Sequence, residues 1–189
     1  MVFKFYVELE DSSPLVWRRI VVPANYSFYK LHMVLQGAFG WDNCHLFEFS
    51  ENGLGDELCY GMPYDNDEPD SEYVKINAKK AKISRVFMEK GRTLCYVYDF
   101  GDNWKHRITF EGIEMKDIDF PYCVGGGGAC PPEDVGSMDG YHRMLEIFEL
   151  ADHPEKTEYR EWLGLVEGEN WNLDFCSIRE VNKRLCLLE

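Results

Sequence analysis

The sequence lacks any apolar run long enough to cross a membrane, which takes about 20 residues. Its first residues, Met1 to Ser13, also lack the apolar core and small-residue cleavage site of a signal peptide. Regular cysteine spacing is missing too, because the seven cysteines form an odd and irregular set. These absences predict a reduced, cytoplasmic protein without membrane association and without a disulfide framework.

Positive charge is scarce, since 20 Lys and Arg residues stand against 34 Asp and Glu, for a net charge of −14. Affinity for a phosphate backbone depends on basic side chains, so nucleic acid is not expected as a partner of the whole acidic protein. One segment is an exception, because Lys75 to Arg92 holds seven basic residues and one acidic residue. We interpret this segment first as solvated surface, with local nucleic-acid binding as the alternative.

The composition supports a packed core, with 45% hydrophobic and 15% aromatic residues. A chain of 189 residues fits a single domain. We expect this domain, residues 1–189, to contain a strand-rich part at 1–115, a Gly-rich loop at 121–136 and a helical part at 137–189. The predicted class is α+β, with a mixed and mostly antiparallel sheet.

The first 50 residues predict a hairpin, a helix and a strand, which is a β-grasp-like order. Alternating apolar residues indicate strands at 2–10 and 15–22. Apolar residues at spacings of three and four predict a helix from Phe28 that ends near Gly40. A third strand is expected at 45–50.

The middle of the chain predicts an acidic loop at 51–72, a short strand at 73–77 and a basic helix at 78–90. Within the loop, the run DNDEPD at 65–70 superficially resembles a calcium-binding EF-hand. The resemblance fails because Asp70 occupies the position of the required glycine. This loop therefore predicts no calcium site.

A second hairpin is expected from strands at 93–100 and 104–113. In both strands the larger side chains recur at every second residue. A three-residue loop, 101–103, would place these two rows on one face of the sheet and set Tyr98 opposite His106. We therefore predict a three-residue loop.

The stretch from Pro121 to Gly136 has a composition that suits neither a helix nor a strand, because it contains four consecutive glycines. A phosphate-binding loop is disfavoured, since the known glycine motifs are absent and Glu133 and Asp134 would repel phosphate. These carboxylates suit instead the first turn of a helix that begins near Pro131 or Pro132.

The C-terminal third predicts further helices that form a layer on the sheet. One apolar stripe runs from Tyr141 to Ala151, with Ser137 or Asp139 as the cap. A short helix is expected to begin at Pro154 and to stop at Gly164. The capping box Ser177 to Glu180 opens the last helix.

His106 is the first candidate for chemistry, because it interrupts the aromatic row of the second hairpin. One interpretation is a core histidine satisfied by a backbone carbonyl. The other is proton transfer, with Asp99 or Asp102 fixing the imidazole tautomer. The candidate catalytic residues are Asp99, Asp102, His106, Glu133 and Asp134.

Metal binding and ligand recognition each have weaker candidates. Cys123 and Cys130 are separated by six residues, which does not match common zinc spacings. No cofactor is predicted, and the alternative is zinc or another divalent metal held by these cysteines with His106. The candidate binding residues are Arg18 and Arg19, expected on opposite faces of their strand, and the aromatic residues Tyr98 and Trp104.

The chain resembles the plasmid pRiA4b ORF-3-like family, also labelled as insertion-element passenger TnpR proteins. The resemblance is carried by the run YDFGDNW at 98–104 with His106, and by ACPPEDVG at 129–136 followed by Gly140 and Tyr141. It covers nearly the whole chain. It implies an α+β domain without an established biochemical activity, linked to plasmids and mobile elements by genetic context.

Two functions of different classes remain open from the sequence. The first is a soluble interaction or ligand-binding module, whose partner would be an unknown protein or small molecule. Its site would lie where the 98–106 hairpin meets the 121–136 loop. The second is a metal-dependent hydrolase or nuclease using Asp99, Asp102, His106, Cys130, Glu133 and Asp134.

Overall fold

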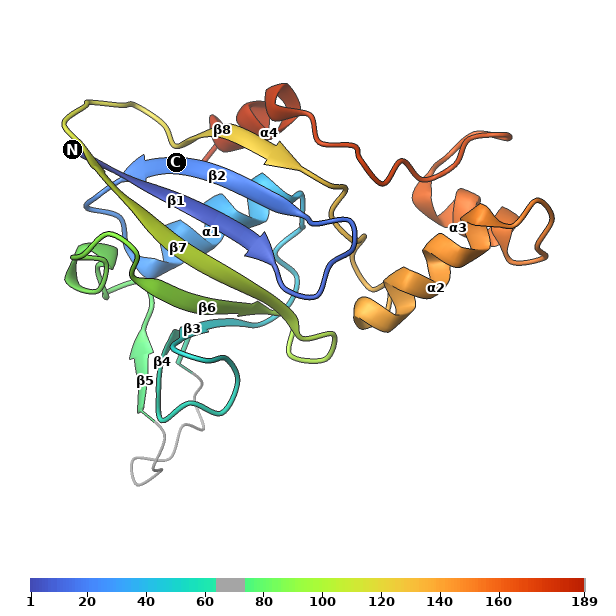
Figure 1. Cartoon of the computed structure of the whole chain (residues 1–189). Helices are drawn as coiled ribbons and strands as arrows, with labels where there is room; N and C mark the ends of the chain where they lie inside the picture. Colours follow the sequence, from blue (N-terminus) through green and yellow to red (C-terminus); the bar gives the residue numbers. More distant parts are fainter. Residues whose placement is uncertain (64–73, 189) are drawn as a thin grey trace.

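A computed structural model describes residues 1–63 and 74–188 of the chain (Figure 1). Its strands are β1 (Val2–Leu9), β2 (Trp17–Pro23), β3 (Phe47–Ser50), β4 (Leu58–Gly61), β5 (Val74–Asn77), β6 (Thr93–Tyr98), β7 (Trp104–Glu114) and β8 (Tyr122–Gly127). They form one eight-stranded sheet in the order β5-β4-β3-β6-β7-β1-β2-β8. Only β4 and β5 pair in parallel, so the predicted α+β class with a mixed, mostly antiparallel sheet is confirmed.

Two of the α-helices cover one face of this sheet. Helix α1 (Phe28–Phe39) crosses the strands, and α4 (Ile178–Leu185) packs against both α1 and β8. Helices α2 (Ser137–Glu149) and α3 (Lys156–Leu163) lie beyond the end of the strands (Figure 1). The predicted helical layer is therefore made by α4 together with α1.

The core lies between α1 and the inward face of the sheet. In β1 the side chains of Phe3, Phe5 and Val7 are buried there, which agrees with the alternation of the sequence. The predicted helix is α1. Ser27 caps its start by accepting a hydrogen bond from the Lys30 amide, and Gly40 ends it in the left-handed conformation, at φ 95°.

In the second hairpin the larger side chains of both strands lie on one face of the sheet, as predicted, but the turn is longer than predicted. Tyr98 pairs with Trp104, and Tyr96 rather than Tyr98 pairs with His106. The turn is therefore the five residues 99–103, and its ends are joined by a hydrogen bond from the Asn103 amide to the Asp99 carbonyl of 2.7 Å. A shift of two residues keeps the large side chains on one face, so the predicted shared face is confirmed and the predicted loop length is wrong.

The Gly-rich stretch is only partly a loop, because its first half forms the edge strand β8. The glycines of this strand lie against Trp17 of β2. A Cβ atom at Gly127 would lie 2.8 Å from Trp17 Nε1, and one at Gly126 would lie 2.9 Å from Arg18 Cδ. A side chain at these positions would clash with β2, which explains why they are glycine. The prediction that the composition of this stretch does not suit a strand was therefore wrong for residues 122–127.

Three other predictions need correction. The segment 78–90 contains only a short 3₁₀ helix, Ile83–Arg85, because its backbone bonds across the chain: the Phe28 amide donates to the Ala81 carbonyl. No helix begins at Pro131 or Pro132, and α2 begins after Gly136, which serves as its N-cap in place of Ser137 or Asp139. The predicted acidic loop contains β4, and the DNDEPD run lies outside the described residues.

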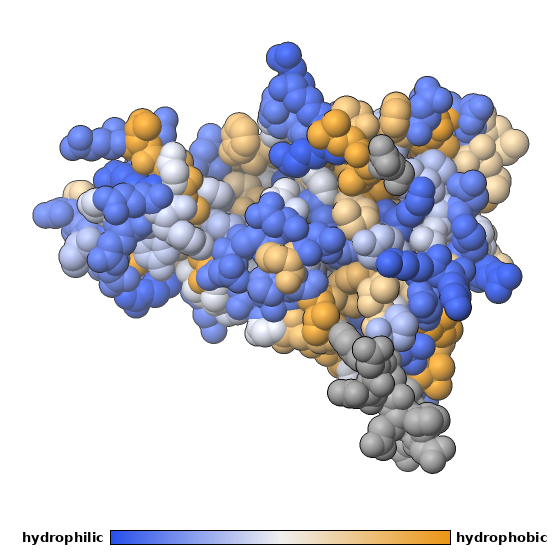
Figure 2. All heavy atoms as spheres, turned by 180° about the vertical axis from the view of Figure 1, so that it is seen from behind, coloured by the Kyte–Doolittle hydropathy of each residue, from blue (hydrophilic) through white to orange (hydrophobic). Residues whose placement is uncertain are grey.

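No helix within residues 1–63 and 74–188 has the length and apolarity required to cross a bilayer. Seen from behind, the surface carries separate hydrophobic patches among hydrophilic side chains (Figure 2). Below the surface, the rows of buried aromatic and aliphatic side chains form one core cluster. Packing in this core holds α1, β3 and β6 in place, and the candidate site lies beside the ends of these three elements.

Candidate functional site

The turn between β6 and β7 and the loop that follows β8 meet at one end of the sheet. The Tyr98 hydroxyl donates to Glu133 Oε1 at 3.0 Å. The Gly136 amide donates to Asp102 Oδ2 at 3.2 Å. The two segments that the sequence singled out are thus in direct contact, although they lie 34 to 35 residues apart along the chain.

A third segment, the connection between α1 and β3, supplies the central side chain of the site. His45 lies in this connection, and its Nε2 is 3.0 Å from Asp134 Oδ1, 3.6 Å from Asp99 Oδ2 and 3.9 Å from Glu133 Oε2. The neighbouring backbone is held in place because the Asp99 amide donates to the Leu46 carbonyl. One imidazole therefore faces carboxylates from the hairpin turn and from the Gly-rich loop.

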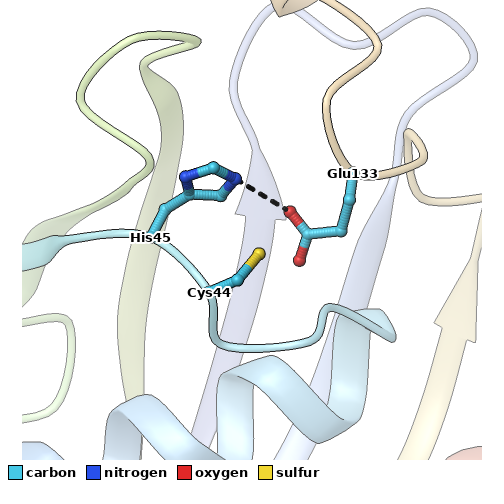
Figure 3. A group of neighbouring side chains, drawn as sticks. All are labelled: Cys44, His45 and Glu133. Carbon is cyan, nitrogen blue, oxygen red and sulfur yellow. Dashed lines mark ion pairs between the residues drawn. The ribbon is translucent and has the colours of Figure 1, made fainter.

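Two overlapping groups of potential metal ligands share His45. In the first group Cys44 Sγ, His45 Nε2 and a Glu133 oxygen lie within 4.8 Å of one another (Figure 3). In the second group His45 is joined by Asp99 and Asp134. Imidazole and thiolate are ligands that zinc prefers, and a carboxylate is common beside them. The residue types thus fit zinc.

Glu133 has one oxygen that is satisfied and one that is not. Oε1 accepts hydrogen bonds from the Asp42 amide at 2.8 Å and from the Tyr98 hydroxyl at 3.0 Å. Oε2 is buried and has no hydrogen-bond partner among the described residues. A buried carboxylate oxygen without a partner is unfavourable, and a cation between Oε2 and His45 would remove that cost.

Tyr98 positions this carboxylate. The ring stacks on Trp41, with 4.9 Å between ring centroids, and its hydroxyl also accepts a hydrogen bond from the Cys44 amide at 3.1 Å. Burial, together with the hydrogen bonds to the Cys44 thiol and to Glu133, raises the pKa of Tyr98 well above its ordinary value, and the hydrogen bond from the Cys44 amide opposes this shift only in part. The hydroxyl therefore stays protonated and keeps donating to Glu133.

His106 lies away from this cluster, in the core. It is fully buried, its Nδ1 is 3.3 Å from the Tyr96 carbonyl, and its ring packs edge-on against Phe39 and Trp41. Burial lowers the pKa of His106 to about 3. The structure thus gives His106 the environment of a neutral core histidine. Trp104 is 1% exposed, so it offers no open surface to a partner.

The arginine and cysteine candidates also lie outside the His45 cluster. Arg18 is buried and donates to four backbone carbonyl oxygens, those of Trp17, Ala38, Gly127 and Gly128. Arg19 points to the opposite face, as predicted, and pairs with Glu111. Cys123 is buried and donates to the Gly125 carbonyl. Burial raises the pKa of the Cys130 thiol, which lines a separate cavity.

The basic segment 75–92 lies at the end of the sheet opposite α2 (Figure 1). Lys82 donates to the Asn25 carbonyl, and Arg92 forms an ion pair with Glu51. Two of its charges are thus engaged within the protein. Nucleic-acid binding through this segment stays a prediction.

Sequence reasoning missed Cys44 and His45. Their only local signal is a short polar run, WDNCH at 41–45, that directly follows the end of α1. Nothing in that run indicates that Glu133 and Asp134 will lie beside it. The sheet order places β3 next to β6 but puts β8 at the far edge of the sheet. The contact therefore depends on the chain after β8, which brings Glu133 and Asp134 back to His45.

Comparisons with known proteins identify relatives along nearly the whole chain. The family model described as "Plasmid pRiA4b ORF-3-like protein" matches residues 1–180. "Uncharacterized protein y4hQ" of Sinorhizobium fredii is 33% identical over 181 residues, which cover 95% of this chain and 89% of that protein. The crystal structure of a protein of unknown function, MM3350 from Methanosarcina mazei Go1, matches with a TM-score of 0.77 and 30% identity, over 95% of this chain and 96% of that one. The chain belongs to the plasmid pRiA4b ORF-3-like family, as the motifs of its hairpin and its Gly-rich loop indicated.

Proposed function

We propose that this protein is a ligand-binding module whose primary ligand is a divalent transition metal ion, best matched by zinc. The ion would be held by Cys44, His45 and Glu133, where the hairpin turn meets the Gly-rich loop. The observation that carries the proposal is Glu133 Oε2, which is buried, has no hydrogen-bond partner among the described residues and lies 3.9 Å from His45 Nε2. The family's link to plasmids rests on its name and adds nothing to this chemistry.

The mixture of donor atoms favours zinc over calcium or magnesium. Hard cations take oxygen ligands almost exclusively, whereas zinc accepts nitrogen, sulfur and oxygen together. Asp99 and Asp134 add negative charge around His45 and would raise the affinity for any cation. Because Cys44 is exposed, a metal ion can reach it from solvent.

A metal-dependent hydrolase is the second candidate, and the number of ligands favours it. Catalytic zinc sites have three protein ligands, whereas structural zinc sites have four. A bound zinc ion supplies Lewis-acid chemistry. Asp134, whose side chain is 70% exposed, lies 3.0 Å from His45 Nε2 and is available to accept a proton from a substrate at the surface.

The proposal is tested by metal content and by titration. Untagged protein is expected to bind one zinc ion per chain, measured by elemental analysis and by calorimetric titration of chelator-treated protein. Glu133→Gln should weaken zinc binding about tenfold or more, because it removes the charge but keeps the size of the side chain. Glu146→Gln, an exposed glutamate of α2, is the matched control. If wild-type protein binds no zinc, His45 is simply the ion-pair partner of its carboxylates and the proposal fails.

A further inference from the structure

A second candidate site shares no residue with the His45 cluster. There a cavity of about 650 Å³ opens between α4, the end of α1, residues 129–132 of the loop and the connection between α3 and α4. Its volume is within the range of about 300 to 1,000 Å³ typical of small-molecule sites. Neither the metal ligands nor the hairpin turn line it.

The walls of this cavity are built from aromatic and other apolar side chains held in fixed positions. Trp171 lies in the connection between α3 and α4, where its Nε1 donates to the Tyr141 hydroxyl at 3.3 Å, and Leu165 lines the cavity from the same connection. The connection is tied to the loop because the Ala129 amide donates to the Leu173 carbonyl at 2.7 Å. Phe175, 60% exposed, adds apolar surface that no part of the described chain covers.

The charged groups that line the cavity leave one positive charge available. Glu180 is paired with Lys183 at 2.8 Å, and Glu169 accepts a hydrogen bond from the Val166 amide. The Arg18 guanidinium donates its hydrogen bonds to backbone carbonyls of the protein. Arg184 donates only through Nε, to the Gly37 carbonyl at 2.8 Å, so among the described residues its terminal nitrogens have no hydrogen-bond partner.

These terminal nitrogens lie at the wall of the cavity. A Cβ atom at Gly40, itself a lining residue, would be 3.6 Å from Arg184 Nη2. A guanidinium with two free nitrogens binds a carboxylate through two parallel hydrogen bonds. The neighbouring apolar walls would bury the body of the same ligand.

We propose that this cavity binds a small organic acid with an aromatic or similarly apolar body, its carboxylate on Arg184 and its body against Trp171 and Phe175. This ligand site is separate from the metal site and does not depend on it. Cys130 and Pro131 line the cavity on the side of the loop.

The test is a titration of the full chain with 2-naphthoate, followed by calorimetry and by tryptophan fluorescence. We expect saturable binding of one molecule per chain, about tenfold tighter than that of the neutral isostere 2-naphthamide. Arg184→Gln should remove this preference and Arg184→Lys should retain part of it. Arg179→Gln, on an exposed position of the same helix outside the cavity, is the matched control and should bind as wild type does.

Several results would overturn the proposal. Equal affinity of the wild type for acid and amide excludes the role of Arg184 without the need for any variant. The absence of saturable binding at millimolar naphthoate excludes the site itself. If naphthoate binding is lost after metal removal or in Glu133→Gln, the acid is bound by the metal and not by the cavity. The proposal is supported if naphthoate binding is unchanged in metal-free protein and in Glu133→Gln, and if Arg184→Gln no longer prefers naphthoate to naphthamide.

Discussion

Asn182 of α4 hydrogen-bonds to both backbone groups of Cys123 in the edge strand β8. The Cys123 amide donates to Asn182 Oδ1 at 2.7 Å, and Asn182 Nδ2 donates to the Cys123 carbonyl at 3.0 Å. The side-chain amide thus occupies the place that a peptide group of a further strand would take. Through this contact a helix closes the edge of the sheet.

Asn182→Ala is expected to lower the free energy of unfolding by about 1 to 3 kcal/mol, because it leaves both groups of Cys123 without their partner. Asn182→Asp keeps the acceptor for the Cys123 amide but sets a carboxylate oxygen against the Cys123 carbonyl, so it should destabilise the protein as well. Urea denaturation measures both. Arg179→Ala, an exposed position of the same helix, should change stability by less than about 0.5 kcal/mol. Equal effects of Asn182→Ala and Arg179→Ala would show that the contact contributes nothing.

Arg18 and Arg19 offer a comparison of adjacent identical residues on opposite faces of β2. Arg18→Met should cost about 3 kcal/mol or more, because it removes a buried guanidinium and leaves carbonyls of the Gly-rich loop and of α1 unsatisfied. Arg19→Met removes a partly exposed ion pair with Glu111 and should cost less than about 1 kcal/mol. Thermal and urea unfolding of the two variants measure the difference, and a similar loss in both would contradict the assignment.

Tyr98→Phe tests the positioning of Glu133. The phenyl ring keeps the stacking on Trp41 but no longer donates to Glu133 Oε1. We expect zinc affinity to fall about tenfold, as for other groups that orient a metal ligand, with little change in the circular dichroism spectrum. Tyr122→Phe is the matched control, because among the described residues that hydroxyl accepts a hydrogen bond only from the exposed Lys116. Unaltered zinc affinity in Tyr98→Phe would separate Tyr98 from the site.

Stability should fall as the pH drops below about 6.5, the ordinary pKa of histidine. Burial lowers the pKa of His106 to about 3 and that of His32 to about 4 in the folded protein. Between these values and about 6.5 the unfolded chain binds protons that the folded chain does not. Each histidine therefore lowers the free energy of unfolding by up to about 1.4 kcal/mol for each unit by which the pH falls. His106→Gln should reduce the slope of unfolding free energy against pH between about 6 and 5. An equal slope in His106→Gln and in the wild type would refute the assignment.

Periodicity predicted the elements whose stability comes from one buried stripe. The positions of Phe28, Leu31 and Leu35 gave α1, and the alternation of Phe3, Phe5 and Val7 gave β1. The same logic placed Tyr98 and Trp104 on one face, although the turn is longer than predicted, because a shift by two residues preserves the face.

Elements that depend on a distant partner were not predictable in this way. The glycines of β8 form a strand because Trp17 and Arg18 lie against them. Of the segments that form the candidate site, the hairpin and the Gly-rich loop were named from the sequence, but His45, which faces both, was not. A candidate such as His106 was prominent in the sequence because it interrupts an aromatic row, yet that position is in the core.

The closure of β8 by α4 also has a consequence for the order of events during synthesis. Asn182 follows Cys123 by 59 residues. At about 5 to 20 residues per second, the ribosome adds these residues over roughly 3 to 12 s. During that interval β8 can pair with β2 while its outer edge, with the half-exposed Val124, remains open to other chains. A nascent chain of this protein is therefore most exposed to intermolecular strand pairing after β8 has emerged and before α4 has.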